Sequence, residues 1–142
     1  MEINKATEKD FDEITAVWEA SVRATHDFLP ETELQYLRPL VRTEFLPAVQ
    51  VYHIRQEQDI VAFLGVLEDK IEMLFVHPAA MKKGYGRQLL RFAIDDLQMT
   101  KVDVNEQNPN AVGFYLHAGF KLLSRSPLDS MGKPFPILHL GL

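Results

Sequence analysis

One stretch of the chain, residues 72–90, constrains the fold more than any other. It reads as an apolar strand ending near Val76, a basic Gly-x-Gly turn at Gly84 and Gly86, and the start of an amphipathic helix. Glycine lets a ligand approach the backbone because it carries no Cβ, and the first turn of a helix presents unpaired N–H groups at the positive end of its dipole. With Lys and Arg beside the turn, the pattern predicts a site for a phosphate or pyrophosphate.

Length and composition narrow the class of protein. The 142 residues fit one domain, residues 1–142, and the net charge of -5 argues against general nucleic-acid binding. The absence of cysteine excludes disulfides, thiolate metal sites and a cysteine nucleophile. The N-terminus has no apolar signal core, and the longest apolar run, residues 60–67, is too short to span a bilayer. We therefore expect a cytoplasmic protein without a membrane segment.

Hydrophobic periodicity and turn signals predict the order β-α-α-β-β-β-α-β-α-β-β, a mixed α/β layered domain. The expected strands begin at Ile3 and then lie at residues 49–55, 60–67, 71–76, 101–104, 120–124 and 137–142. The expected helices lie at residues 8–25, 30–46, from the glycine turn to about 98, and 109–118. Thr7 and Asp10 have capping-box spacing, Pro39 should kink or split the second helix, and residues 49–76 should form an antiparallel meander.

Two common phosphate-binding turns do not fit the spacing around Gly84. A P-loop needs Gly-x-x-x-x-Gly-Lys-Ser/Thr, which is absent. A dinucleotide-binding fingerprint needs a third glycine where Leu89 stands, and its strand belongs to a βαβ unit rather than to an antiparallel meander.

Two segments carry a family resemblance. Val76-His-Pro followed by Lys-Gly-Tyr-Gly-Arg-Gln-Leu-Leu at residues 83–90 resembles motif A of the GNAT (GCN5-related N-acetyltransferase) family, and residues 108–120, Asn-Pro-Asn-Ala-Val-Gly-Phe-Tyr-Leu-His-Ala-Gly-Phe, resemble its motif B. Residues 21–29 and 104–108 further resemble a small bacterial YjaB-type subgroup. The resemblance implies a mostly antiparallel mixed sheet with helices on both faces. It also implies N-acetyltransferase activity by direct transfer from acetyl-CoA in a ternary complex.

The resemblance assigns a cofactor site. It implies that the coenzyme A pyrophosphate rests on the turn formed by Met81, Lys82, Lys83, Gly84, Tyr85, Gly86 and Arg87. It also implies that the backbone of Leu74, Phe75 and Val76 pairs with the pantetheine arm and the acetyl carbonyl. The family usually has Arg or Gln where this chain has Met81, so a backbone contact there is retained and a side-chain contact is lost. Asn108 matches the asparagine that contacts the arm, and it also suits a helix cap before Pro109.

The resemblance also suggests catalytic groups. Tyr115 matches the tyrosine that protonates the departing thiolate, although periodicity alone favours a core position. Glu72 is the only ionisable residue between Ile71 and Val76, and a carboxylate there should be desolvated and act as a general base or as a structural acceptor. His26, Asp27 and a water molecule remain alternatives for the base.

The acceptor site implied by the resemblance is built by the first two helices and the link between them. The residues nominated are Trp18, Ser21, His26, Asp27 and Phe28. Helical spacing with Phe11, Ile14 and Val22 favours a core position for Trp18 instead. The acceptor is a small-molecule amine or a protein amine, the histidines show no metal-ligand spacing, and the protein is a monomer or a homodimer. The alternative is a non-catalytic acyl-CoA-binding module that senses the cofactor or holds a partner.

Overall fold

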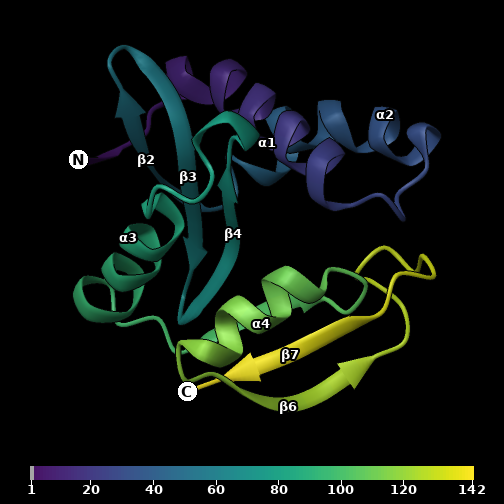
Figure 1. Ribbon diagram of the computed structural model, residues 1–142. Helices are drawn as coiled ribbons and strands as arrows, with labels where there is room; N and C mark the ends of the chain where they lie inside the picture. The colour runs from purple at the N-terminus through teal and green to yellow at the C-terminus, as the bar shows by residue number, and fades with distance from the viewer. Residues whose placement is uncertain (1) are drawn as a thin grey trace.

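A seven-stranded sheet organises the computed structural model, which describes residues 2–142 (Figure 1). Its strands are β1 (Ile3–Lys5), β2 (Gln50–Gln56), β3 (Asp59–Leu67), β4 (Lys70–Val76), β5 (Lys101–Asn105), β6 (Lys121–Ser126) and β7 (Ile137–Gly141). Their order in the sheet is β1-β2-β3-β4-β5-β7-β6. Within residues 2–142, only β4 and β5 pair in parallel, whereas every other neighbouring pair is antiparallel. The expected mixed, mostly antiparallel sheet is confirmed.

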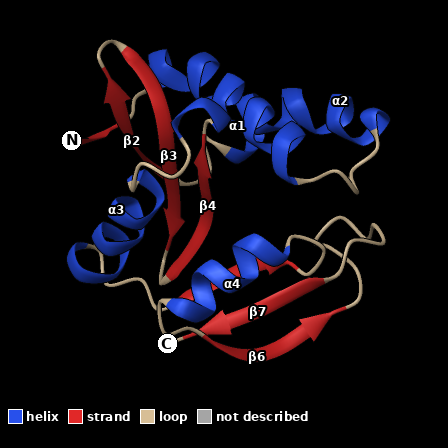
Figure 2. Ribbon diagram, in the orientation of Figure 1, coloured by secondary structure: helices blue, strands red, loops and turns tan. Residues whose placement is uncertain are grey.

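Helices cover both faces of this sheet, as expected (Figure 2). The α-helices are α1 (Phe11–Thr25), α2 (Glu31–Leu40), α3 (Tyr85–Arg91) and α4 (Pro109–His117). Short turns are η1 (Glu8–Asp10), η2 (Val41–Phe45), η3 (Pro78–Ala80) and η4 (Phe92–Asp96). One core, centred on Phe63 and Ile14, lies under α1 and α2, while a second, centred on Leu64 and Leu89, lies under α3 and α4. Because Phe63 and Leu64 are adjacent in β3, their side chains enter opposite cores.

Helix ends follow the sequence signals with two differences. Thr7 and Asp10 form the predicted capping box, but the turn it opens is a 3₁₀ turn, and α1 begins only at Phe11. Pro39 does not break the second helix: α2 continues to Leu40 and then widens into the π-helical turn η2. Proline has no N–H to donate to the preceding turn, and a π-turn directly after it lets the chain remain helical. None of the helices in residues 2–142 is long and apolar enough to cross a bilayer.

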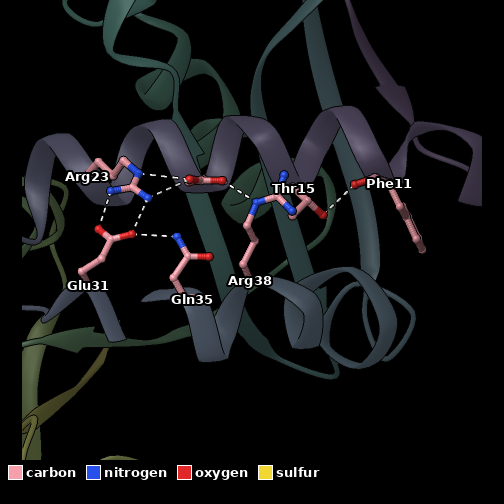
Figure 3. Close-up of polar contacts among 7 residues, drawn as sticks. Phe11, Thr15, Arg23, Glu31, Gln35 and Arg38 are labelled. Atoms are coloured by element: carbon pink, nitrogen blue, oxygen red, sulfur yellow. Dashed lines mark hydrogen bonds and ion pairs between the residues drawn. The ribbon is translucent and has the colours of Figure 1, made fainter. Parts of the chain in front are cut away.

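Ion pairs fix α2 against α1 (Figure 3). Arg23 donates two hydrogen bonds to Glu31, at 2.7 and 2.9 Å, and the Glu31 carboxylate also accepts one from Gln35. These bonds, with that from Arg23 first, lower the pKa of Glu31 to about 2. A second arginine, Arg38, binds Glu19 on α1. The link between the two helices, residues 26–30, is therefore anchored at both ends.

Candidate active site

The central feature of the site is a gap between the two parallel strands. β4 and β5 are paired at only two positions, Lys70 with Lys101 and Ile71 with Val102, and then they separate. The separation starts at a bulge, because Ile71 and Met73 lie opposite neighbouring residues of β3 and Glu72 is left as the extra residue. A cavity of about 980 Å³ follows the gap and is lined by both strands, by α4 and by the glycine turn.

The glycine turn forms one end of this cavity. Gly84 is the N-cap of α3 with φ of 89°, and Lys82 has φ of 64°, so both residues are in the left-handed region. The left-handed conformation is energetically unfavourable for a residue other than glycine, and residues that adopt it are concentrated at functional sites. The first helical bond joins the Gln88 N–H to the Gly84 carbonyl, which leaves the N–H groups of the intervening residues without a helical acceptor. Lys82 and Arg87 line the cavity.

Of the eleven residues assigned to the cofactor, ten line the cavity. They are Leu74, Phe75, Val76, Met81, Lys82, Gly84, Tyr85, Gly86, Arg87 and Asn108. Lys83 is exposed and is absent from the lining. The side chain of Asn108 accepts a hydrogen bond from the Ala111 N–H at 3.3 Å, so the predicted helix cap is confirmed, and the residue is only 8% exposed.

The two predicted catalytic residues both reach the cavity but differ in surroundings. Tyr115 is buried between α4 and the sheet, and this burial raises the pKa of its hydroxyl. Glu72 is exposed, and one of its carboxylate oxygens lies 3.6 Å from the Lys70 ammonium. The expectation that Glu72 is desolvated is therefore wrong, because the bulge turns its side chain into the open cavity.

Of the residues predicted for the acceptor site, some line the cavity and the others do not. Ser21 and His26 line the cavity, whereas Trp18 is buried in the core under α1 and α2. Asp27 is exposed and Phe28 packs against His26, and neither contributes to the cavity lining. The family resemblance nominated both Trp18 and Ser21, and the core position that helical spacing favours for Trp18 is confirmed.

The environment of His26 favours a neutral imidazole. Burial lowers its pKa below the ordinary value of 6.5, and the Asp27 carboxylate offsets only part of that effect. The Thr25 hydroxyl donates to the Ser21 carbonyl at 2.8 Å and therefore accepts from His26 Nδ1 at 2.7 Å.

A series of hydrogen-bonded polar side chains that the sequence did not predict lies on the opposite wall of the cavity. Asp103 on β5 contacts both Lys70 on β4, at 2.9 Å, and His139 on β7, at 2.7 Å. His139 in turn contacts Ser126 on β6 at 2.7 Å. Alternation did place Asp103 between the core residues Val102 and Val104, but only the strand order reveals its partners.

Asp103, the acidic residue of this hydrogen-bonded series, has a lowered pKa. Burial alone would raise the pKa of Asp103, but the hydrogen bonds from Lys70 and His139 outweigh it and hold the pKa below the usual value. The same contact with Asp103 raises the pKa of Lys70. Both groups are therefore ionised near neutral pH.

Side-chain contacts join the β6–β7 loop to α2 and to the link that precedes it. Lys133 binds Glu33 at 3.0 Å and lies 5.5 Å above the centre of the Tyr36 ring. Phe135 packs against Phe28 with 6.0 Å between ring centroids. Two segments that lie 100 residues apart in the sequence are thus held together, and Leu128, Asp129 and Ser130 of the same β6–β7 loop line the cavity.

Comparisons with known proteins agree with this geometry. Residues 47–122 match the family model described as an acetyltransferase (GNAT) domain. The peptidyl-lysine N-acetyltransferase YjaB of Escherichia coli is 38% identical over 140 residues, which cover 98% of this chain and 95% of that protein. The solution structure of apo YjaB from Escherichia coli superimposes with a TM-score of 0.89 at 35% identity, covering 99% of this chain and 95% of that one.

A more distant structure shares the fold. The PaiA N-acetyltransferase of Thermoplasma acidophilum, solved in complex with coenzyme A, has a TM-score of 0.76 at 18% identity and covers 99% of this chain and 98% of that one. The domain match and the full-length similarity to YjaB show that the chain belongs to the GNAT family of N-acetyltransferases, in its YjaB-type subgroup.

Proposed function

We propose that this enzyme transfers the acetyl group of acetyl-CoA directly to the side-chain amine of a lysine in a peptide or protein. One observation carries the proposal: the gap between β4 and β5 opens into a single cavity shared by the glycine turn, Tyr115 and the polar chain around Asp103. A cofactor and an amine can therefore meet between them. The proposal also takes residues 1–142 as one catalytic domain, and a cytoplasmic location remains a prediction that cell fractionation would test.

The unpaired edge of β4 suits the pantetheine arm. Beyond Ile71, the strand is paired with β3 on one side, and no strand in residues 2–142 pairs with its other side. Backbone groups of Leu74, Phe75 and Val76 are therefore available to an extended, amide-bearing ligand, which would add to the sheet like a strand. Asn108 lines the same gap from the start of α4.

The glycine turn suits the pyrophosphate. A Cβ at Gly86 would lie 3.6 Å from Val76 Cγ2 and 3.8 Å from Phe114 Cζ, and both of those residues line the cavity. The absence of a side chain at Gly86 thus keeps this wall open. Free N–H groups at the start of α3, with Lys82 and Arg87, supply the donors and positive charge that an anion requires.

The chemistry follows from this placement. The amine nitrogen attacks the thioester carbonyl carbon, and the carbon–sulfur bond then breaks to release the thiolate. Tyr115 donates its proton to that thiolate, and its raised pKa keeps the hydroxyl protonated until then. The attacking nitrogen loses one proton as the amide forms, and that proton balances the one taken from Tyr115. With no cysteine in the chain, an acetyl-cysteine intermediate cannot form, so we favour direct transfer in a ternary complex.

Charge is distributed along the cavity in a way that supports a cationic acceptor. Lys82 and Arg87 lie at the glycine turn. On the wall formed by β4, β5 and the β6–β7 loop, the carboxylates of Glu72, Asp103 and Asp129 outnumber the one ammonium group that the described residues place there, that of Lys70. Carboxylates attract an ammonium group to that wall. The relatives that are 36–38% identical are named peptidyl-lysine N-acetyltransferases, which supports lysine over other amines.

An acetylation screen tests the proposal. Acetyl-CoA binding is measured by calorimetry, and thiol release is then followed with a lysine peptide blocked at its N-terminus, the same peptide with arginine and a free N-terminus, and a polyamine. Release should be fastest with the lysine peptide, and mass spectrometry should find the acetyl group on its side chain. Binding without release on any amine would instead favour the non-catalytic module, and no binding would refute both.

A further inference from the structure

The polar chain on the β5–β7–β6 wall has the connectivity of a proton relay. The Ser126 Oγ lies 2.7 Å from His139 Nε2, and His139 Nδ1 lies 2.7 Å from Asp103 Oδ1. The other Asp103 oxygen accepts a hydrogen bond from Lys70 at 2.9 Å. Three adjacent strands each contribute one member of the Ser126–His139–Asp103 series, and all of them line the cavity that Tyr115 also lines.

The protons of this series can be assigned from the partners. Asp103 is ionised and can only accept, so His139 Nδ1 must carry a proton and donate it. In a neutral imidazole the Nε2 atom is then the acceptor, and the Ser126 hydroxyl must donate to it. The Ser126 oxygen keeps its lone pairs free for a donor in the cavity. An ammonium group is such a donor.

We propose that His139 is the general base that deprotonates the acceptor amine, with Ser126 as the relay that touches the amine and Asp103 as a positioning residue. The inference rests on the proposed acetyl transfer. The ammonium gives a proton to Ser126 Oγ while the Ser126 hydroxyl proton moves to His139 Nε2. The amine becomes neutral and nucleophilic, the serine is unchanged, and the imidazolium is stabilised by the Asp103 carboxylate 2.7 Å away.

Other candidate bases are less well placed. Glu72 is exposed, and its carboxylate lies 3.6 Å from the Lys70 ammonium, which competes for the lone pairs that would accept a proton. Asp27 is exposed and outside the cavity lining. His26 lines the cavity, but burial disfavours its cationic form and its Nδ1 is bonded to a hydroxyl rather than to a carboxylate.

Several charged or titratable groups line the same cavity as His139 and belong to any account of the pH dependence of the reaction. They are Lys70 and Glu72 on β4, Asp103 on β5, Asp129 in the β6–β7 loop, and His26 on the opposite wall.

The test compares His139→Gln with His117→Gln, since His117 is exposed on α4 and absent from the cavity lining. With a lysine peptide at pH 7, His139→Gln should lower kcat by about 100-fold, within the usual range for a general base, and leave acetyl-CoA affinity unchanged. The loss of kcat in His139→Gln should shrink as the pH approaches the reference pKa of a lysine amine, about 10.4, because more of the amine is then already neutral. It should also be smaller for a peptide α-amine, whose reference pKa is about 8. His117→Gln should match the unmodified enzyme throughout.

Two further variants separate a relay from a structural role. Asp103→Asn should reduce kcat with the same pH dependence, and ¹⁵N NMR of the His139 ring should show the Nδ1–H tautomer in the unmodified protein and a mixture in the variant. Ser126→Ala should lower kcat by about 10-fold, because a water molecule can replace one hydroxyl in a relay.

Four results would overturn the inference. They are full activity of His139→Gln at pH 7, an equal loss at every pH, an Nε2–H tautomer in the unmodified protein, and an acetyl adduct on Ser126 that forms during turnover. The last result would make Ser126 a nucleophile instead of a relay. Failure of acetyl transfer itself is distinguishable, because it would appear in the unmodified enzyme with every amine.

Discussion

Replacing Gly86 with alanine should have opposite effects on stability and on cofactor binding. Gly86 is the second residue of α3 and has no positive φ, so alanine fits its backbone. The added Cβ meets nothing closer than 3.6 Å, at Val76 Cγ2, and therefore causes no clash within the protein. Alanine is favoured over glycine by about 0.8–1 kcal/mol inside a helix, and about half of that is expected this close to its start. The unfolding free energy should thus rise by about 0.5 kcal/mol.

The same methyl group should weaken coenzyme A binding. It stands between Val76 and Phe114 on the cavity wall, where the pyrophosphate is expected to approach the backbone. Losing one charge-assisted hydrogen bond costs about 1.5–3 kcal/mol, which corresponds to a Kd about 10- to 100-fold higher. Chemical denaturation of the apo protein and calorimetric titration with coenzyme A measure the two effects separately.

Gly113→Ala is a matched control for this experiment. Gly113 lies within α4, is exposed, and would place its Cβ with no atom within 4 Å. It should raise the unfolding free energy by up to about 1 kcal/mol through helix propensity alone and leave the Kd unchanged. An unchanged Kd in a correctly folded Gly86→Ala protein would refute the assignment of the glycine turn to the pyrophosphate.

Three further predictions address the cofactor turn, the general acid and the buried histidines. Lys82→Ala should raise the Kd for coenzyme A by about 3- to 10-fold at low salt, while Lys83→Ala should not, since of these two lysines only Lys82 lines the cavity. An equal rise of the Kd in both variants would contradict this. Tyr115→Phe should bind acetyl-CoA normally and lose about 100-fold in kcat, and unimpaired turnover would remove the hydroxyl from the mechanism. Burial lowers the pKa of His26 and His53 below 6.5, so the unfolded chain binds more protons as pH falls from there. Stability by denaturant titration should accordingly drop between about pH 6.5 and 5, and His53→Gln should reduce that drop.

Patterns that depend on neighbouring residues were predictable. The capping box at Thr7, the cap at Asn108 and the left-handed Gly84 each follow from the needs of one turn. The meander of β2, β3 and β4 follows from alternation and short turns. The family motifs also lie in such local segments, which is why the sequence pointed to the cofactor before any contact was known.

Patterns that depend on strand partners were not predictable. The bulge inserts Glu72 as one extra residue in β4. A single inserted residue reverses the direction of a side chain, so Glu72 points into the open cavity instead of being buried. Trp18 lies on the same helix as Ser21, yet it belongs to the core rather than to the cavity. Helical spacing with Ile14 and Val22 predicts the core position of Trp18, whereas only packing shows that Ser21 reaches the cavity.

The sequence by itself determined the order of the elements and the glycine turn, because helix and strand periods are set within a few residues. The tertiary structure decided which strands separate, which lysine faces the cavity, and that Ser126, His139 and Asp103 form one hydrogen-bonded series. The reason is physical: His139 meets Asp103 only because β7 lies between β5 and β6, and a contact across 36 residues depends on strand order and register, which no local pattern specifies.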